Sequence, residues 1–592
     1  MSKPQDLAAI EAPVGVEPAN APEWGSDLAA ELLRRLEVEW IALVPGSSYR
    51  GLQDSLVNHL GNRDPQMLVC LHEEHAVAIA HGWAKVTDRA MAAAVHSNVG
   101  LMHATMAVYN AWCDRAPLLL FGATGPVDAT RRRPWIDWIH TSRDQGALVR
   151  PYVKFDEQPG SPAASVEAIL RAWQLIHAAP RGPAYICLDV ADQERRLETP
   201  VALPDLARFR PAPAPAAGTS EVAAAVAALK AAKRPVILAG RSAREAGPWA
   251  ARVALAEALG ARVVTDMKTA AAFPTAHPLH VGEASTFLSP EQKAAIAQAD
   301  LVLALDWMDL MGALRQALPG EAELPKVISA TLDDHMVNGW SYDHYALPPA
   351  DIRLVCSGDA AVTALVEAMG IDASAVEMAP PPAAEPPAAG EAIDLTFLAG
   401  SLQVAAQSRA VSWLRFPLGW PADLTPFSDP LSYLGADGGA GIGSGPGIAV
   451  GAALALRGSG RVAVAVLGDG DFVMGASALW TAAHYRIPLL IVIANNLSYY
   501  NDETHQETVA RQRGRPPENK WIGQRLDDPA VDLPAMARSL GAASPDPVSD
   551  PAALAEALEA GFAAAEAGGL HVIDVRVRPG YVSAMPATMD DD

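Results

Sequence analysis

Cysteine is scarce in this sequence. Only four cysteines occur among 592 residues, and no two of them form a Cys-x-x-Cys pair; they are Cys70, Cys113, Cys187 and Cys356. This usage indicates neither a zinc site nor a disulfide framework. We therefore expect buried, reduced thiols.

Positive charge and long apolar runs are also in short supply. The 45 Lys and Arg residues face 68 Asp and Glu residues, which gives a net charge of -23. A surface of this sign disfavours nucleic acid and anionic membranes as partners. No apolar run approaches the roughly 18 residues of a membrane span, and the first residues lack the apolar core of a signal peptide. We expect a cytoplasmic protein.

The chain is too long for a single hydrophobic core, and domains of roughly 100–200 residues predict three of them. Two stretches rich in Pro and Ala are typical of linkers: LPDLARFRPAPAPAAGTSE from Leu203 and MAPPPAAEPPAAGEA from Met378. They predict domains at 25–200, 215–375 and 393–592, preceded by a flexible extension at 1–24.

Short apolar runs that end in Gly, Asp or Asn alternate with amphipathic stretches. These runs include WIALVPGSS, MLVCLHEEH, PLLLFGATG, PVILAG, LVLALD, VAVAVLGDG and PLLIVIANN. Such runs are typical of buried parallel strands. The pattern predicts an α/β fold with three doubly wound parallel-sheet domains, whose ligands bind at the carboxyl ends of the strands.

The segment from Val462 to Asn496 carries the strongest local signal. It predicts a strand, a Gly-Asp-Gly turn, a helix, a second strand and an Asn-Asn pair. A βαβ crossover places Asp469 and Asn496 at the same end of neighbouring strands. With the backbone carbonyl of Ser498, they offer the hard oxygen ligands that suit Mg²⁺. Gly-Asp-Gly alone would indicate only a turn.

Phosphate groups are expected beside this metal site. Gly468 and Gly470 allow the backbone to approach a phosphate, and the N-terminus of the following helix favours an anion.

Gly-Asp-Gly followed at this distance by Asn-Asn resembles the signature of thiamine diphosphate (ThDP) enzymes. The stretch SALWTAAHYRIPLLIVIANN is similar to the benzoylformate decarboxylase members of a family that includes acetolactate synthase and pyruvate decarboxylase. The resemblance implies that Asp469 and Asn496 hold Mg²⁺ on the diphosphate. Many members have Ser near the diphosphate at the position where this chain has Asp471. The resemblance therefore does not imply the hydrogen bond to the diphosphate at this position.

The resemblance also assigns a role to GADGGAGIGSGPGIAVGAAL, from Gly435. Ile442 falls where the family has an apolar residue that props ThDP in a bent shape. The carbonyl of Ala440 would then accept a hydrogen bond from the 4′-amino group. Without the resemblance, the stretch is a glycine-rich loop with one core Ile.

Glu73 is the predicted activator of ThDP. In LVCLHEEHAVAIAHGWAKVTD, Gly82-Trp83-Ala84 begins nine residues after Glu73, as in the family, and this spacing selects Glu73 over Glu74. The family uses such a Glu to stabilise the reactive tautomer of the aminopyrimidine. Alternatively, two Glu residues would simply favour the N-terminus of a surface helix.

Further candidates lie on the substrate side. AVHSNVGLMHATMAVYNAWCDRAPLLLFGATG, from Ala94, also resembles benzoylformate decarboxylases and implies that His96 transfers protons near the reacting carbonyl. Many acetolactate synthases have Thr there. Ser47, in PGSSY, would lie near the substrate, although Ser47 or Ser48 would equally cap a helix. His505 is the candidate for a second acid–base group.

Two polar segments flank these candidates. RRRPWIDWIH, from Arg131, would suit an acidic or aromatic substrate or a solvated face. Residues 498–525 are expected to form a lid.

The resemblance implies a small-molecule carbonyl substrate and a homodimer or homotetramer with an active site shared between subunits. Our first prediction is decarboxylation of a 2-oxo acid, with an aromatic one as the leading candidate. The alternatives are an acyloin- or acetolactate-type carboligase, a lyase acting on a diketone or acyloin, and a silent ThDP-binding regulatory protein. Whether the central domain binds FAD is left open.

Overall fold

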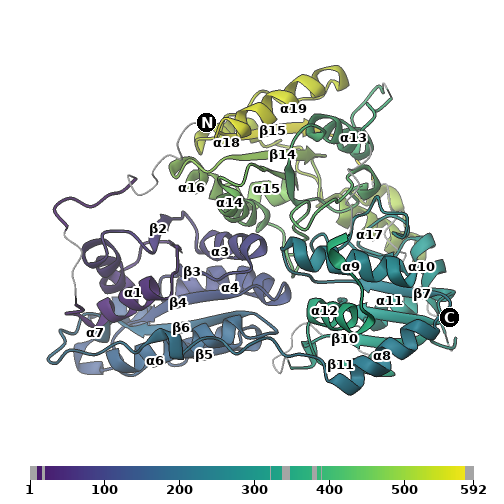
Figure 1. The fold of residues 1–592 in the computed structure, drawn as a ribbon. Coiled ribbons are helices and arrows are strands. Elements are labelled where there is room, and N and C mark those ends of the chain that lie inside the picture. The colour runs from purple at the N-terminus through teal and green to yellow at the C-terminus, as the bar shows by residue number, and fades with distance from the viewer. Residues whose placement is uncertain are drawn as a thin grey trace.

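The structure is a computed structural model that describes residues 10–16, 21–320, 322–335, 347–375, 383–388 and 390–580. Three lobes each form around one sheet, and the named strands within each sheet pair in parallel (Figure 1). The predicted fold class is confirmed.

The first lobe contains a six-stranded sheet in the order β2-β1-β3-β4-β6-β5. Helices α3 (Glu73–Thr87) and α4 (Ser97–Cys113) cover one face, and α1 (Gly25–Arg35) and α6 (Pro162–His177) cover the other. The strands are β1 (Trp40–Leu43), β2 (Gln66–Val69), β3 (Met91–Ala94), β4 (Leu118–Thr124), β5 (Phe155–Glu157) and β6 (Pro183–Asp189).

The central lobe contains a five-stranded sheet in the order β11-β10-β9-β7-β8. Its strands are β7 (Pro235–Ala239), β8 (Arg262–Val264), β9 (Leu301–Leu305), β10 (Lys326–Ala330) and β11 (Ile352–Leu354). One face is covered by α8 (Thr219–Ala231), α9 (Ala246–Leu259) and α12 (Gly358–Met369), and the other by α10 (Pro290–Ala297) and α11 (Leu310–Ala317).

The third lobe contains a four-stranded sheet in the order β12-β13-β14-β15. Its strands are β12 (Val411–Arg415), β13 (Val462–Gly468), β14 (Leu489–Asn495) and β15 (Leu570–Arg576). Helices α14 (Gly445–Leu456), α16 (Ala478–His484) and α18 (Leu533–Ser539) cover one face, and α13 (Leu395–Ala406) and α19 (Pro551–Glu566) cover the other.

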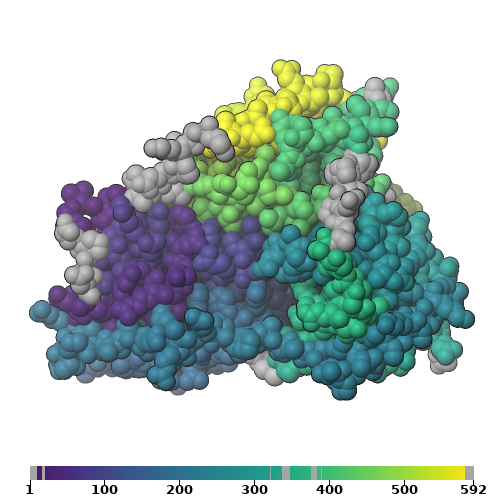
Figure 2. Space-filling model, in the orientation of Figure 1, coloured from purple at the N-terminus to yellow at the C-terminus, as the bar shows by residue number. Residues whose placement is uncertain are grey.

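Two glycines let the first and third lobes approach closely, and Figure 2 shows these lobes in contact. A Cβ on Gly82 of α3 would overlap the carbonyl oxygen of Ile448, and a Cβ on Gly451 of α14 would overlap that of Ile79. Since any larger side chain would push the two backbones apart, glycine is needed at both positions. The α3–α14 crossing therefore fixes the Glu73 helix against the helix that follows the glycine-rich loop.

Part of the predicted N-terminal extension lies against the body of the protein. Tyr485 donates a hydrogen bond to the Glu11 carboxylate, and Asn62 donates one to the Glu11 carbonyl. Residues 1–9 and 17–20 of this extension, and 378–382 and 389 of the second predicted linker, lie outside the described residues. No helix within the described ranges is long and apolar enough to cross a membrane.

Candidate active site

The predicted metal ligands meet at the carboxyl edge of the third sheet. β13 pairs with β14 so that Gly468 lies beside Ala494, which brings Asp469 and Asn496 to the same edge. The Ser498 amide donates to Asp469 Oδ2 at 3.2 Å and to Asn496 Oδ1 at 3.0 Å. The two side-chain oxygens therefore converge on one point of the backbone.

The local structure differs from the prediction in one respect. Helix α15 (Asp469–Gly475) begins at Asp469 itself, with Gly468 as its N-cap, so no separate turn precedes the helix. The Gly470 amide donates to Asp469 Oδ1 at 3.0 Å. This compact junction places the Asp469 carboxylate at the first residue of the helix.

Asp469 is suited to bind a cation. Its side chain is buried, and among the described residues no Lys, Arg or His forms an ion pair with it. Burial raises the pKa of Asp469 to about 6, and hydrogen bonds from nearby amides offset part of this effect. Because a buried carboxylate without a counter-charge is costly, the residues present fit a divalent cation bound here.

Asp469, Asn496 and Ser498 together form what we call the metal corner. The glycine-rich loop lies between this corner and the first lobe. Ala440 adopts a positive φ of 55°, and the side chain of Ile442 is 46% exposed. A Cβ on Gly441 would overlap the Met106 side chain of α4. The loop therefore presents Ile442 outward, as a residue that contacts a cofactor would require.

Asp471 anchors this loop. Its carboxylate accepts a hydrogen bond from the Gly443 amide at 2.6 Å and forms an ion pair with Arg415 at 3.3 Å. Arg415 also pairs with Asp437. Burial raises the pKa of Asp471, and Arg415 opposes that rise. Direct contact of Asp471 with the diphosphate stays a prediction.

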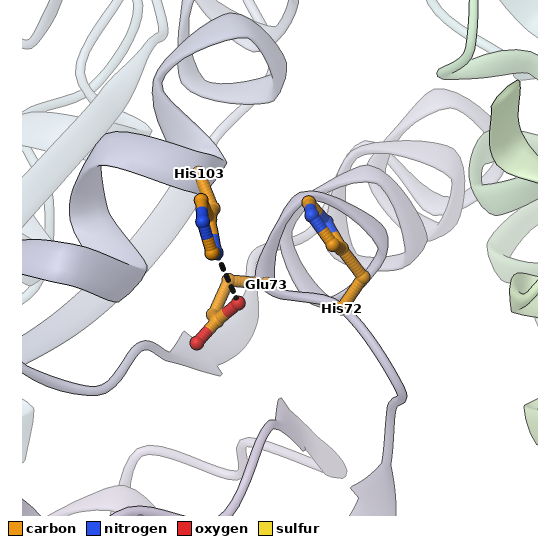
Figure 3. A group of neighbouring side chains, drawn as sticks. All are labelled: His72, Glu73 and His103. Atoms are coloured by element: carbon orange, nitrogen blue, oxygen red, sulfur yellow. Dashed lines mark hydrogen bonds and ion pairs between the residues drawn. The ribbon is translucent and has the colours of Figure 1, made fainter.

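Glu73 is the first residue of α3 and is buried against Gly100 of α4. Its carboxylate lies 3.0 Å from Nδ1 of His103, and His72 stacks on the His103 ring at a centroid distance of 4.9 Å (Figure 3). The side chain of His103 is 57% exposed. The partner of the Glu73 carboxylate is therefore a largely exposed histidine.

Glu74, its neighbour, faces a different group. The Ser444 hydroxyl donates to the Glu74 carboxylate at 2.8 Å, which links α3 to the glycine-rich loop. The two adjacent glutamates thus have separate partners, and the choice of Glu73 over Glu74 as the activator stays a prediction.

His96 follows β3 and caps α4 at the carboxyl edge of the first sheet. Its Nδ1 lies 2.9 Å from the Ser48 hydroxyl, and its ring meets the ring of His140 edge to face at 4.6 Å. Burial lowers the pKa of His96, and His140 lowers it further, whereas Glu73 acts in the opposite sense. A neutral imidazole at neutral pH follows from these effects.

Two predicted residues lie elsewhere. Ser47 is partly buried at the start of a short 3₁₀ turn (Ser47–Tyr49), and the serine that contacts His96 is Ser48. His505 is exposed on α17 (Tyr500–Gln512), and no hydrogen bond, ion pair or ring contact joins it to another residue in the part of the chain that the structure describes. Their catalytic roles stay predictions.

The polar segment 498–525, which follows the metal corner, leaves the third lobe and returns to it at nearly the same place. The Tyr499 amide donates to the Gln524 carbonyl, and the Leu526 amide donates to the Leu497 carbonyl, so its two ends are paired. The buried Glu503 accepts a hydrogen bond from the Ser498 hydroxyl. Its role as a lid stays a prediction.

Sequence reasoning missed Ser48, His103 and His140 as members of the site. Ser48 shares a turn with Ser47, so only the backbone geometry separates them. His103 lies on the α4 face that contacts Glu73. The helical repeat places it on the same face as His96 at the start of the helix. His140 lies in a loop segment whose path no periodic pattern predicts.

Comparisons with known proteins agree with this geometry. Residues 23–148 match the N-terminal TPP binding domain of thiamine pyrophosphate enzymes, 222–346 match their central domain, and 418–575 match their C-terminal TPP binding domain. The chain belongs to the thiamine pyrophosphate enzyme family. The cofactor of this family is ThDP, as the resemblance implied.

The relatives carry several activities. A probable 2-ketoarginine decarboxylase of Pseudomonas aeruginosa is 31% identical over 50% of this chain and 51% of its own length. A benzoylformate decarboxylase of the same species is 26% identical over 74% and 80%. An acetolactate synthase large subunit of Lactococcus lactis is 26% identical over 48% of both chains. The chain thus spans about half the length of the 2-ketoarginine decarboxylase and of the acetolactate synthase subunit that it matches.

Solved structures support the fold. A ThDP-dependent 4-hydroxybenzoylformate decarboxylase of Rhodococcus jostii superposes with a TM-score of 0.75 at 22% identity, covering 94% of this chain and 99% of that one. A benzoylformate decarboxylase of Polynucleobacter necessarius gives a TM-score of 0.74 at 19% identity, covering 94% and 99%.

Proposed function

We propose that this protein is a ThDP- and Mg²⁺-dependent enzyme that decarboxylates a 2-oxo acid, with an aromatic one as the first candidate. The observation that carries the proposal is the His96 imidazole, which is half-buried beside Ser48 at the sheet edge and caps the helix whose residues contact Glu73. A proton-transfer group at this place suits the replacement of CO₂ by a proton.

The chain offers holders for both parts of the cofactor. Asp469, Asn496 and the Ser498 carbonyl would hold Mg²⁺ on the diphosphate, and the Gly468–Gly470 backbone would lie against that anion. Ala440 and Ile442 would contact the aminopyrimidine. When bound, ThDP supplies the nucleophilic carbon and the electron sink that let CO₂ leave.

Side chains of the protein then accept and donate the protons. Glu73 would exchange its His103 partner for the aminopyrimidine ring and hold a proton there. His96 is mostly neutral, so it first accepts a proton, and it then returns one to the carbon that has lost CO₂. Ser48 fixes the orientation of His96 because it binds Nδ1 and leaves Nε2 free.

The active site is proposed to be shared between subunits of a dimer or tetramer. Leu71, Val99 and Met102 are exposed around Glu73, and Ile442 and Met474 are exposed beside the metal corner. Apolar side chains that gather around two halves of a site indicate a surface covered by a partner. A second copy of the chain is the partner that the family implies.

The decisive test is CO₂ release from benzoylformate by purified protein with ThDP and Mg²⁺. We expect release by the wild type and loss of most of it in Glu73→Gln. If ThDP binds but neither benzoylformate nor an aliphatic or cationic 2-oxo acid loses CO₂, the decarboxylase proposal is wrong.

Carboligation is the second candidate, because acetolactate synthases are among the relatives. Product analysis with an added aldehyde acceptor separates the two activities. A coupled acyloin that accumulates faster than free aldehyde would identify a carboligase.

Two further proposals concern the surroundings of the enzyme. We place it in the cytoplasm, since its four cysteines are buried and unbridged as expected in a reducing compartment. FAD stays an open question for the central lobe. The flavin absorbance of the purified protein answers it.

A further inference from the structure

A second group of side chains that can bind a metal ion lies away from the metal corner, at the start of α3. His72 is the N-cap of this helix, Glu73 is its first residue, and His103 reaches them from α4. One ligand atom of each residue lies within 4.8 Å of the other two (Figure 3). The described residues contain no other group of three His, Cys, Asp or Glu side chains of this kind.

The distances in this group suit a tetrahedral metal ion. Nδ1 of His103 lies 3.0 Å from Oε2 of Glu73. Metal–ligand bonds of about 2.0–2.1 Å, as zinc forms with nitrogen and oxygen, place two tetrahedral ligands ~3.3 Å apart. An ion therefore fits between these two atoms after a small shift. The His72 ring, which stacks on His103 at a centroid distance of 4.9 Å, is half-buried and supplies the third ligand by turning toward the ion.

The kinds of ligand favour zinc over magnesium. Neutral imidazole suits Zn²⁺, whereas Mg²⁺ prefers oxygen ligands. Two His and one Glu also form known zinc sites in which water fills the fourth position. Nδ1 of His72 accepts a hydrogen bond from the Glu74 amide at 3.2 Å, and metal binding through either ring nitrogen gives up this bond. At this length the bond is weak, so its loss is a minor cost.

The surroundings also admit a cation. The Glu73 carboxylate is buried, and within the described ranges its ion-pair partner is His103 and no Lys or Arg. A buried carboxylate that lacks a permanent positive partner is stabilised by a bound cation. His103 is 57% exposed, so an ion can reach the site from solvent.

We propose that His72, Glu73 and His103 bind Zn²⁺ in the ThDP-free protein, and that Zn²⁺ and ThDP exclude each other at Glu73. The ion uses the same carboxylate that acts on the aminopyrimidine in the proposed function, so only one of them can be bound to it. Zinc is then an inhibitor that competes with ThDP. The zinc site itself stands on the geometry of the three side chains, whereas the exclusion rests on the proposed role of Glu73.

The first test measures zinc affinity without substrate or cofactor. The full chain, without a polyhistidine tag and with Mg²⁺ present, competes for Zn²⁺ with a chromogenic chelator. His103→Asn removes a ligand at an exposed position, and it should weaken binding by more than the roughly 10–100-fold that loss of an outer-shell partner costs. His277→Asn is the control, because His277 lies 3.2 Å from Glu257 in a pair without a third ligand. Equal affinities in wild type and His103→Asn would overturn the site.

Co²⁺ in place of Zn²⁺ identifies the ligands. Four-coordinate Co²⁺ with nitrogen ligands absorbs visible light strongly, whereas six-coordinate Co²⁺ bound by oxygens at the metal corner is pale. We expect strong absorption in the wild type and in His277→Asn, and its loss in His72→Asn and His103→Asn. A pale spectrum in the wild type would contradict the proposed site.

The last test concerns the exclusion. Addition of ThDP with saturating Mg²⁺ to the Co²⁺-loaded protein should remove the visible absorption. Absorption that persists while ThDP is demonstrably bound would refute the exclusion. Failure of the metal-free protein to bind ThDP with Mg²⁺ would instead contradict the proposed function, and the chelator competition would still decide the zinc site.

Discussion

At the scale of the residue, the active site is defined by groups that are costly or poorly partnered in the isolated chain. Asp469 is a buried carboxylate that pairs with no Lys, Arg or His among the described residues, Glu73 contacts an exposed His103, and Ile442 projects outward. Each is unfavourable for folding alone. Each becomes favourable when a metal, a cofactor or a second subunit is supplied, which is how functional sites commonly depart from stability rules.

Asp469→Asn should stabilise the cofactor-free protein while abolishing Mg²⁺-dependent binding of ThDP. Burial raises the pKa of Asp469 from 3.8 to about 6, so the unfolded chain ionises first and stability falls as pH rises between these values. At pH 8 the removal of this charge should add stability on the order of 2–3 kcal/mol. Thermal melts at pH 8 and pH 4.5 check this, because the gain should be much smaller in acid. A lower melting temperature for the variant at pH 8 would contradict it.

Glu73→Gln and Glu74→Gln form a matched pair. Loss of the Glu73 carboxylate should reduce kcat by about 10²–10⁴-fold, the usual effect of removing an acid–base group. Glu74→Gln keeps an acceptor for the Ser444 hydroxyl and should change kcat only a few-fold. Steady-state rates at saturating ThDP give the comparison. Equal losses in both variants would show that the spacing selected the wrong glutamate.

Local spacing predicted Asp469, Asn496 and Glu73, because each stands at a fixed place in a strand–helix unit. The partners that set their chemistry come from elsewhere in the chain. Arg415 reaches Asp471 from another strand, and His140 reaches His96 across a loop with a strained Trp135. Such contacts depend on tertiary packing, which a single sequence does not encode in any short pattern.

At the scale of the element, the α3–α14 crossing determines how the first lobe sits on the third. Its closest contacts involve backbone atoms at Gly82 and Gly451, which leave no room for a side chain. The sequence showed both glycines, but only the fold shows that they face each other. The runs that predicted β4, β13 and β14 were correct because buried parallel strands are continuously apolar.

Gly82→Ala should destabilise the protein by about 1–3 kcal/mol or more, because the added methyl group would collide with the Ile448 carbonyl. Gly400→Ala, within α13, is the control. Its methyl group would make ordinary contacts with Pro387 at 3.4 Å, and helix propensity should stabilise that variant by up to about 1 kcal/mol. Chemical denaturation measures both. A stable Gly82→Ala variant would argue against the close crossing.

At the scale of the whole molecule, the three lobes divide the work. The first carries Glu73 and His96, which we propose to transfer protons, the third carries the proposed metal ligands and the glycine-rich loop, and the central lobe packs against both (Figure 1). Chain length and linkers predicted three domains and the apolar runs predicted their parallel sheets, but neither indicated which faces of the domains meet. The exposed apolar residues around the two half-sites support the proposal of a site shared between subunits.

Mixing two inactive variants tests the shared site. If Glu73 of one subunit serves the metal corner of another, a hybrid of Glu73→Gln and Asp469→Asn contains one intact site and one site with both defects. After unfolding and refolding together, about one quarter of all sites should be active. Activity should be absent when either variant is refolded alone. No recovery in the mixture, despite hybrid formation, would place both residues in a site within one chain.

The most direct measurement is the exchange of the C2 proton of ThDP with deuterium in the Mg²⁺-loaded holoenzyme, read by NMR after a rapid quench. It needs no substrate and reports cofactor activation alone. We predict exchange far faster than in free ThDP, slowed by about 10²–10⁴-fold in Glu73→Gln. Exchange at the rate of free ThDP in the wild-type protein, with ThDP demonstrably bound, would contradict the assignment of this chain as an active ThDP enzyme.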